Sequence, residues 1–237
     1  MPLPSFFSSC MNRSPQPWSA AARPALAAVF GIDLRTLALF RAVLATVLLV
    51  DLLRHFGDLA GLYTDFGVMP RAWLVQFDGP WRLSLYLLNG SALVTGALLA
   101  LQCAAAAALL LGWRTRLATV ISFFMWGWLC NRNPMVLIGG DILMTCLLFW
   151  ACFLPLAARW SIDAALSTTA PPRESQHLSW ASAGLLLQVM SVYFFSAFLK
   201  SGVEWMQDHS AVYYALNLDR YATPQGQWLL QFPALLE

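Results

Sequence analysis

The chain alternates between long apolar segments and short polar connections, a pattern typical of helical proteins that cross a membrane several times. Five apolar segments stand out, and they cover residues 37–53, 91–112, 117–130, 135–156 and 180–199. The third is short, since as a helix it would rise only about 21 Å against a hydrocarbon core of about 30 Å. We therefore predict an all-α polytopic transmembrane helical bundle of about five spans.

The connections define the rest of the predicted organisation. Residues 1–30 lack a charged start followed by a compact apolar core, so we expect a flexible leader rather than a cleaved signal peptide, with residues 31–237 forming the transmembrane domain. Residues 56–90 mix aromatic and charged side chains, which predicts a short helix lying in the membrane interface. A new apolar stretch begins near Gly226, so we expect a chain truncated at its C-terminus.

Composition supports membrane insertion and excludes several other classes. Of the 237 residues, 59% are hydrophobic and 11% charged, against about 25% charged in soluble domains. The net charge of +2 is too small for a nucleic-acid-binding protein. The five cysteines and three histidines have no paired or metal-ligating spacing, so we predict no disulfide framework and no metal. Membrane lipids are the expected surroundings.

Basic residues give a weak indication of orientation. Placing the N-terminus in the cytoplasm leaves slightly more arginine and lysine inside, including the short turn that holds Arg114 and Arg116. We therefore expect the N-terminus to be cytoplasmic. Arginines at helix ends on that side need no function, because their long side chains can reach the membrane surface.

The polar centre of the sequence is the connection at residues 131–141. Asp141 has apolar neighbours on both sides, and a carboxylate at membrane depth costs about 2.5–3.5 kcal/mol to insert. Antiparallel spans would bring several polar residues to this same, non-cytoplasmic side: Asp51, His55, Arg132, Asn133, Asp141 and Lys200. Two interpretations remain open, a ligand pocket or buried ion pairs such as Asp141 with Arg132 or Asp51 with Arg54.

Lys200 is the candidate catalytic residue, because it ends an apolar helix. Desolvation lowers the proton affinity of a lysine and can make it a neutral base. Glu204 lies four residues further on, and spacing alone favours an ordinary surface ion pair with Lys200. His55 lies four residues after Asp51, and its spacing favours a satisfied interfacial histidine.

Several motifs together resemble a known family. In chain order they are YTDFGVMPR (63–71), GWRTR (112–116), RNP with GGD (132–141), FLPL with WSID (153–163), and Lys200 with Trp205. This set is similar to the HTTM transmembrane module of vitamin K-dependent γ-carboxylase and of many bacterial proteins. The resemblance covers roughly residues 31–237, and the family's distribution implies a bacterial inner membrane protein.

The resemblance implies quinone chemistry. The carboxylase oxidises vitamin K hydroquinone with O2 to an epoxide, and the base formed removes a proton from a protein glutamate before CO2 adds. Tyr193-Phe194, Lys200 and Trp205 match the stretch that holds its essential lysine. The implied cofactor is therefore a reduced quinone, with Lys200 as base and with Arg132, Asn133 and Asp141 orienting it or binding the ligand.

Two departures from the carboxylase limit this expectation. Pro134 occupies the position of a catalytic-site histidine, and proline can neither donate a hydrogen bond nor exchange a proton. The chain also ends before the further helices and lumenal domain that hold the protein substrate. Quinone-linked oxidation or proton abstraction is therefore the leading hypothesis, and a non-catalytic membrane scaffold or accessory protein is the alternative.

Overall fold

A computed structural model describes residues 23–78, 83–168, 175–218 and 223–232. The chain folds into two compact units, residues 1–185 and 186–237. The α-helices are α2 (Arg23–Phe30), α3 (Leu34–Gly57), α4 (Leu59–Tyr63), α5 (Arg71–Asp78), α6 (Ala92–Leu111), α7 (Thr115–Arg132), α8 (Gly139–Ala151), α9 (Ile162–Leu166), α10 (Trp180–Leu199), α11 (Val203–Met206), α12 (Ala211–Leu216) and α13 (Pro224–Leu229). Two short 3-10 helices, η1 (Leu85–Leu87) and η2 (Pro134–Val136), and two short strands complete the described elements. The all-α prediction is confirmed.

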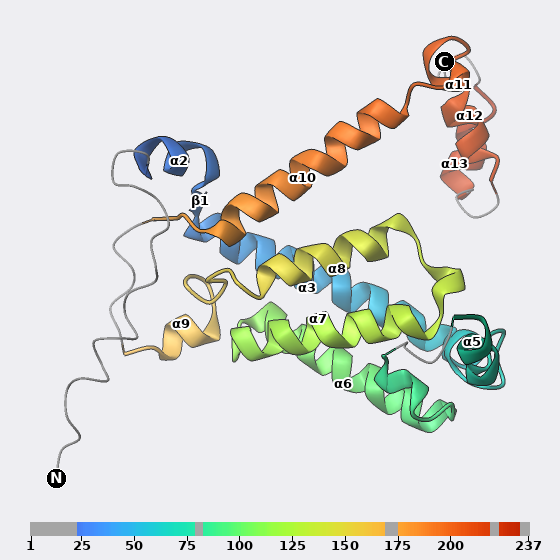
Figure 1. Ribbon diagram of the computed structural model, residues 1–237, viewed down its shortest axis with the longest axis horizontal. Helices are drawn as coiled ribbons and strands as arrows, with labels where there is room; N and C mark the ends of the chain where they lie inside the picture. Colours follow the sequence, from blue (N-terminus) through green and yellow to red (C-terminus); the bar gives the residue numbers. More distant parts are fainter. Residues whose placement is uncertain (1–22, 79–82, 169–174, 219–222, 233–237) are drawn as a thin grey trace. The chain divides into compact units, whose positions relative to one another are not determined.

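The core of the first unit is a bundle of α3, α6, α7 and α8, which lie side by side (Figure 1). α3 and α6 face each other through small and leucine side chains, among them Ala45 and Leu48 of α3 and Ala106 and Leu109 of α6. Small residues let helix backbones approach closely in a membrane. The strands β1 (Ile32–Asp33) and β2 (Gln176–His177) pair antiparallel and connect the start of α3 to the segment before α10.

Helix lengths agree with membrane insertion for three elements. Among the described helices, α3, α6 and α10 are long and apolar enough to cross a membrane. The two other predicted spans correspond to α7, with 18 residues, and α8, with 13 residues. This is an integral membrane protein.

The predicted fourth span, residues 135–156, is wrong at both ends. The side chain of Asn133 accepts a hydrogen bond from the Met135 amide and opens η2 instead of a long helix. α8 begins only at Gly139, and it ends at Ala151, before the turns that contain Pro155. Proline lacks the amide hydrogen that would continue the helix.

Local signals set most other boundaries. The leader predicted over residues 1–30 ends in α2, while residues 1–22 lie outside the described part. α5 provides the short helix expected within residues 56–90. The side chain of Ser91 caps the start of α6, and Gly112 ends it with a φ of 72°, which glycine adopts without strain.

Candidate functional site

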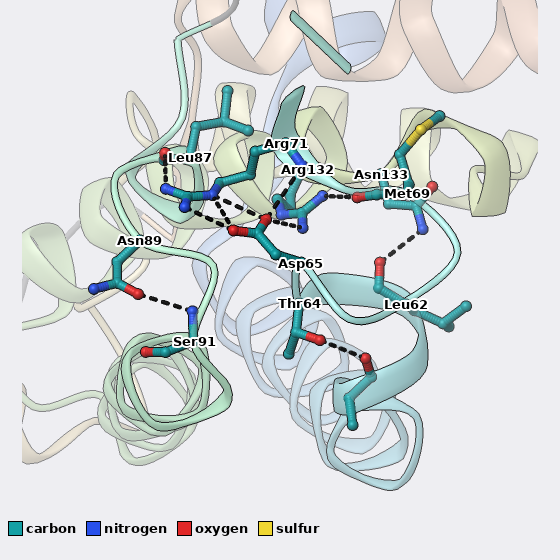
Figure 2. Close-up of polar contacts among 11 residues, drawn as sticks. Leu62, Thr64, Asp65, Met69, Arg71, Leu87, Asn89, Ser91, Arg132 and Asn133 are labelled. Atoms are coloured by element: carbon teal, nitrogen blue, oxygen red, sulfur yellow. Dashed lines mark hydrogen bonds and ion pairs between the residues drawn. The ribbon is translucent and has the colours of Figure 1, made fainter. Parts of the chain in front are cut away.

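Asp65 lies at the centre of a charged cluster at the end of the first unit where α7 gives way to α8, which we call the α7–α8 end. Arg71 Nη2 and Nε donate to Asp65 Oδ2 at 2.7 and 2.9 Å (Figure 2). A further hydrogen bond runs from Arg71 Nη1 to the Leu87 carbonyl at 3.0 Å. The guanidinium therefore joins the 63–71 loop to η1, and its bonds lower the pKa of the Asp65 carboxyl.

Arg132, at the last position of α7, is completely buried beside this pair. Its Nη1 donates to the Met69 carbonyl at 2.8 Å, and its Nη2 lies 3.7 Å from Asp65 Oδ1, too far for a hydrogen bond (Figure 2). Among the described residues, Nε and Nη2 have no hydrogen-bond partner. Arg132 therefore carries unused donors in a site that excludes water.

Asn133 positions the chain next to Arg132. Its amide nitrogen donates to the Leu62 carbonyl at 2.8 Å (Figure 2). Both Arg132 and Asn133 thus bind backbone carbonyls of the 62–69 segment, which the sequence separates from them by more than sixty residues. Two of the motifs that carry the family resemblance, at residues 63–71 and 132–141, are therefore in direct contact.

Asp51 and His55 lie on α3 at the same end. His55 Nδ1 is 2.7 Å from the Asp51 carbonyl oxygen and 3.7 Å from Asp51 Oδ2. The His55 ring lies 5.4 Å from that of Tyr63 and 6.3 Å from that of Trp126. Asp51 Oδ2 is buried without a hydrogen-bond partner among the described residues. The His55 imidazole has a hydrogen-bond partner, in agreement with the interpretation from its spacing, whereas Asp51 Oδ2 has none.

Asp141 lies in the first turn of α8 and does not pair with Arg132. Its Oδ2 accepts the Ile138 amide at 2.7 Å, and its carbonyl accepts Trp126 Nε1 at 3.2 Å. The ion pair between Asp141 and Arg132, one of the open interpretations, is wrong, because Arg132 is bound to the 63–71 loop instead. A carboxylate in the first helical turn satisfies an otherwise free amide and complements the helix dipole.

Tyr63 is a buried phenol near the carboxylates of this end. Its side chain is 2% exposed. Burial raises the pKa of Tyr63, and the nearby Asp51 and Asp141 carboxylates raise it further. Asp51 and Asp141 therefore act on the same phenol. The predicted residues Asp51, His55, Arg132, Asn133 and Asp141 all lie at the α7–α8 end, as antiparallel spans require.

Lys200 belongs to the second unit, directly after α10. Its Nζ lies 4.7 Å from the centroid of the Trp205 ring, a cation–π contact. This contact joins two residues of the matched motif. The role of Lys200 as a base stays a prediction.

The opposite end of the bundle, which we call the Gly112 end, holds a second buried cation. Arg41 is 2% exposed, and it donates to the Leu109 carbonyl at 2.6 Å and to the Trp160 carbonyl at 2.7 Å. It also donates to the Leu110 carbonyl. The guanidinium thus satisfies the last carbonyls of α6, which have no partner inside their own helix. Gly112 packs against Ser161 so closely that a Cβ atom would collide with it.

Asp163 completes the Gly112 end by capping α7 from a distance in sequence. Its carboxylate accepts the amides of Arg114 and Thr115 at 2.8 and 2.7 Å and the Thr115 hydroxyl at 2.7 Å. Burial raises the pKa of Asp163, but the hydrogen bonds from Thr115 and Arg114 outweigh it and lower the pKa overall. The motifs at residues 112–116 and 160–163 are therefore also in contact.

Sequence reasoning missed Asp65, Arg71 and Tyr63 as site residues, although all three lie in the quoted 63–71 motif. Their signal was an acid and a base six residues apart in an interfacial loop. That spacing alone does not distinguish a bidentate pair from two solvated side chains.

Acid should weaken the α7–α8 end. Because the pKa of Asp65 is lowered in the folded protein, its contribution to stability is complete above its ordinary pKa of about 3.9 and is lost as the pH falls below it. We expect the thermal midpoint of the wild type to fall steeply below about pH 4 and that of Asp65→Asn to fall less. Exposed Asp58 provides the control variant, Asp58→Asn. Equal acid dependence in wild type and Asp65→Asn would contradict the assignment.

The sequence model of the HTTM domain family matches residues 31–231. No curated protein and no solved structure matches the chain.

Proposed function

Because the chain belongs to the HTTM domain family, we propose that this integral membrane protein binds a reduced quinone at its α7–α8 end. The observation that carries the proposal is that donors on Arg132 and an acceptor on Asp51 are buried at this end and make no hydrogen bond among the described residues. Leaving such groups unpaired is costly in an apolar environment, and ligand sites tolerate that cost. Buried groups without hydrogen bonds would not stabilise a scaffold.

The residues present fit a hydroquinone head. Each of its two hydroxyl groups can donate one hydrogen bond and accept others. Asp51 Oδ2 would accept from one hydroxyl, and Arg132 Nε or Nη2 would donate to a ring oxygen. The aromatic rings of His55, Tyr63 and Trp126 form the neighbouring surface, which suits a flat apolar ring.

A bound hydroquinone would supply two electrons and two protons. The chain's own contribution would be to orient the ring oxygens and to favour ionisation of one hydroxyl, because a guanidinium stabilises the anion. Lys200 is the proposed base, on the resemblance to the γ-carboxylase. Carboxylation of a peptide is not part of the proposal, because Pro134 starts η2 where the carboxylase carries a histidine.

The competing function is a membrane scaffold. Its support is the density of internal bonds around Asp65: Arg71, Arg132 and Asn133 each donate to a backbone carbonyl. Asp65 also forms ion pairs with both arginines. A scaffold would need these contacts for folding and would not need a reactive lysine.

Quinol binding by the purified protein in nanodiscs tests the proposal. We expect the wild type to bind menaquinol or phylloquinol, and Asp51→Asn to bind about tenfold more weakly, the effect of losing one charge-assisted hydrogen bond. Asp51→Asn should change the thermal midpoint little, since Asp51 Oδ2 makes no hydrogen bond among the described residues and the side chain is 33% exposed. Lys200→Met should keep the fold and lose any epoxide formation that the wild type displays.

Exposed Arg54 on α3 provides the control, and Arg54→Gln should bind quinol as the wild type does. If the wild type binds no quinol, the scaffold function is the better account. If Asp51→Asn binds normally, the quinone lies elsewhere, and if Lys200→Met retains turnover, Lys200 is not the base.

A further inference from the structure

A cavity of about 320 Å³ opens at the Gly112 end of the first unit, away from the proposed quinone site. It lies between the start of α7, the end of α8, the turns that follow α8, and β2. Its lining residues are Thr115, Arg116, Thr119, Ala151, Cys152, Phe153, Leu154, Pro155, Leu156, Ala157 and His177. The volume lies at the lower end of the range for small-molecule sites.

The cavity wall is apolar along the turns after α8, and its basic side chains are Arg116 and His177. Thr115 and Thr119 already use their hydroxyl donors, on Asp163 and on the Thr115 carbonyl. Two other polar side chains are uncommitted. Arg116 has no ion-pair partner among the described residues, and His177 Nε2 is buried without a hydrogen-bond partner there. The free groups are thus a cation and an imidazole, and no carboxylate lines the cavity. This charge pattern favours an anion.

The length of α8 places the cavity within reach of lipid. With 13 residues, α8 rises about 20 Å, which is less than the hydrocarbon thickness of about 30 Å. A helix of this length leaves part of the hydrocarbon core to the segments that flank it, and the turns at residues 152–157 are one of these segments. Irregular backbone is tolerated there only where protein or a polar cavity covers it. An amphipathic ligand would match both the basic side chains and the apolar turns that line the cavity.

We propose that this cavity binds an anionic phospholipid, with its phosphate at Arg116 and His177 and its first acyl carbons against Phe153, Leu154 and Leu156. The predicted orientation agrees with this occupant, because it places the start of α7 at the cytoplasmic leaflet, where anionic lipids concentrate. The site is independent of the quinone proposal, since the two lie at opposite ends of α7.

Protection of Cys152 tests the site directly, because this thiol lines the cavity. The four other cysteines are first replaced, as Cys10→Ser, Cys103→Ala, Cys130→Ala and Cys146→Ala. Alkylation of Cys152 in detergent is then timed with dihexanoyl phosphatidylglycerol, dihexanoyl phosphatidylcholine or inorganic phosphate. We expect phosphatidylglycerol to slow the reaction, and Arg116→Gln to weaken its apparent affinity about tenfold.

Arg35→Gln is the matched control, since it removes an exposed arginine at the same end of the bundle and outside the cavity. It should leave protection unchanged. Equal protection by phosphatidylcholine, or protection by phosphatidylglycerol that Arg116→Gln does not weaken, would overturn the proposal. Protection by inorganic phosphate at the same concentration would assign the site to a soluble anion instead.

Discussion

Replacement of Arg41 by methionine is expected to lower the free energy of unfolding by about 3 kcal/mol, because three backbone carbonyls each lose a hydrogen bond from a cation. Methionine keeps an unbranched apolar stem like that of arginine and offers no donor. Two of the carbonyls end α6, and the third belongs to Trp160. The bonds therefore connect α3, α6 and the turn before α9. Loss of all three should loosen the whole Gly112 end.

Thermal unfolding in detergent measures this effect. A loss of about 3 kcal/mol corresponds to a fall of about 6–12 °C for a chain of this size. Arg35→Met, on the exposed face of the same helix, should shift the midpoint little. If Arg41→Met were as stable as Arg35→Met, Arg41 would be an ordinary arginine that reaches to the membrane surface, and the structural role assigned to it would be wrong.

Replacement of Arg132 by methionine is expected to weaken quinol binding strongly while costing only about 1 kcal/mol of stability. The variant loses the bond to the Met69 carbonyl. It also removes two buried donors that make no hydrogen bond among the described residues, one of which lies 3.7 Å from Asp65. Asp65 keeps its bidentate bond to Arg71. Binding should weaken by about 10- to 100-fold, the range for losing hydrogen bonds from a cation.

Comparing the loss of quinol affinity with the loss of stability distinguishes quinol binding from a scaffold function at this end of the bundle. Quinol titration and thermal unfolding are measured on Arg132→Met and on Arg54→Gln, whose arginine is exposed at the same end. A large loss of stability together with unchanged quinol affinity would assign Arg132 to folding alone and favour the scaffold.

Much of the architecture follows from the sequence because it depends on local chemistry. α10 agrees with the span predicted from Trp180 to about Leu199, since an apolar run there meets polar residues on both sides. α6 is shifted by one residue at each end, where Ser91 and Gly112 act as caps. The span predicted over residues 135–156 is wrong because an apolar run shows only that a segment is hydrophobic and does not show where a helix is capped. Asn133 and Asp141 cap two separate short helices at this run.

The sequence predicts where the candidate site lies in the bundle, but it does not predict which residues contact one another there. Antiparallel spans bring Asp51, His55, Arg132, Asn133 and Asp141 to one end, a consequence of topology that the sequence already contains. The partner of Arg132 could not be predicted, because Asp65 and Asp141 are both acids at that end. The choice between them depends on how the 62–69 loop folds against α7.

The sequence by itself determined that this is an all-α membrane protein of the HTTM family, because apolar segment lengths and ordered motifs are properties of the chain alone. Only the tertiary structure decided which motifs touch. It joined residues 63–71 to 132–133 and residues 112–116 to 160–163, through Arg132, Asn133 and Asp163. Hydrogen bonds require angstrom-scale placement of groups that lie tens of residues apart, and that placement results from the packing of the bundle.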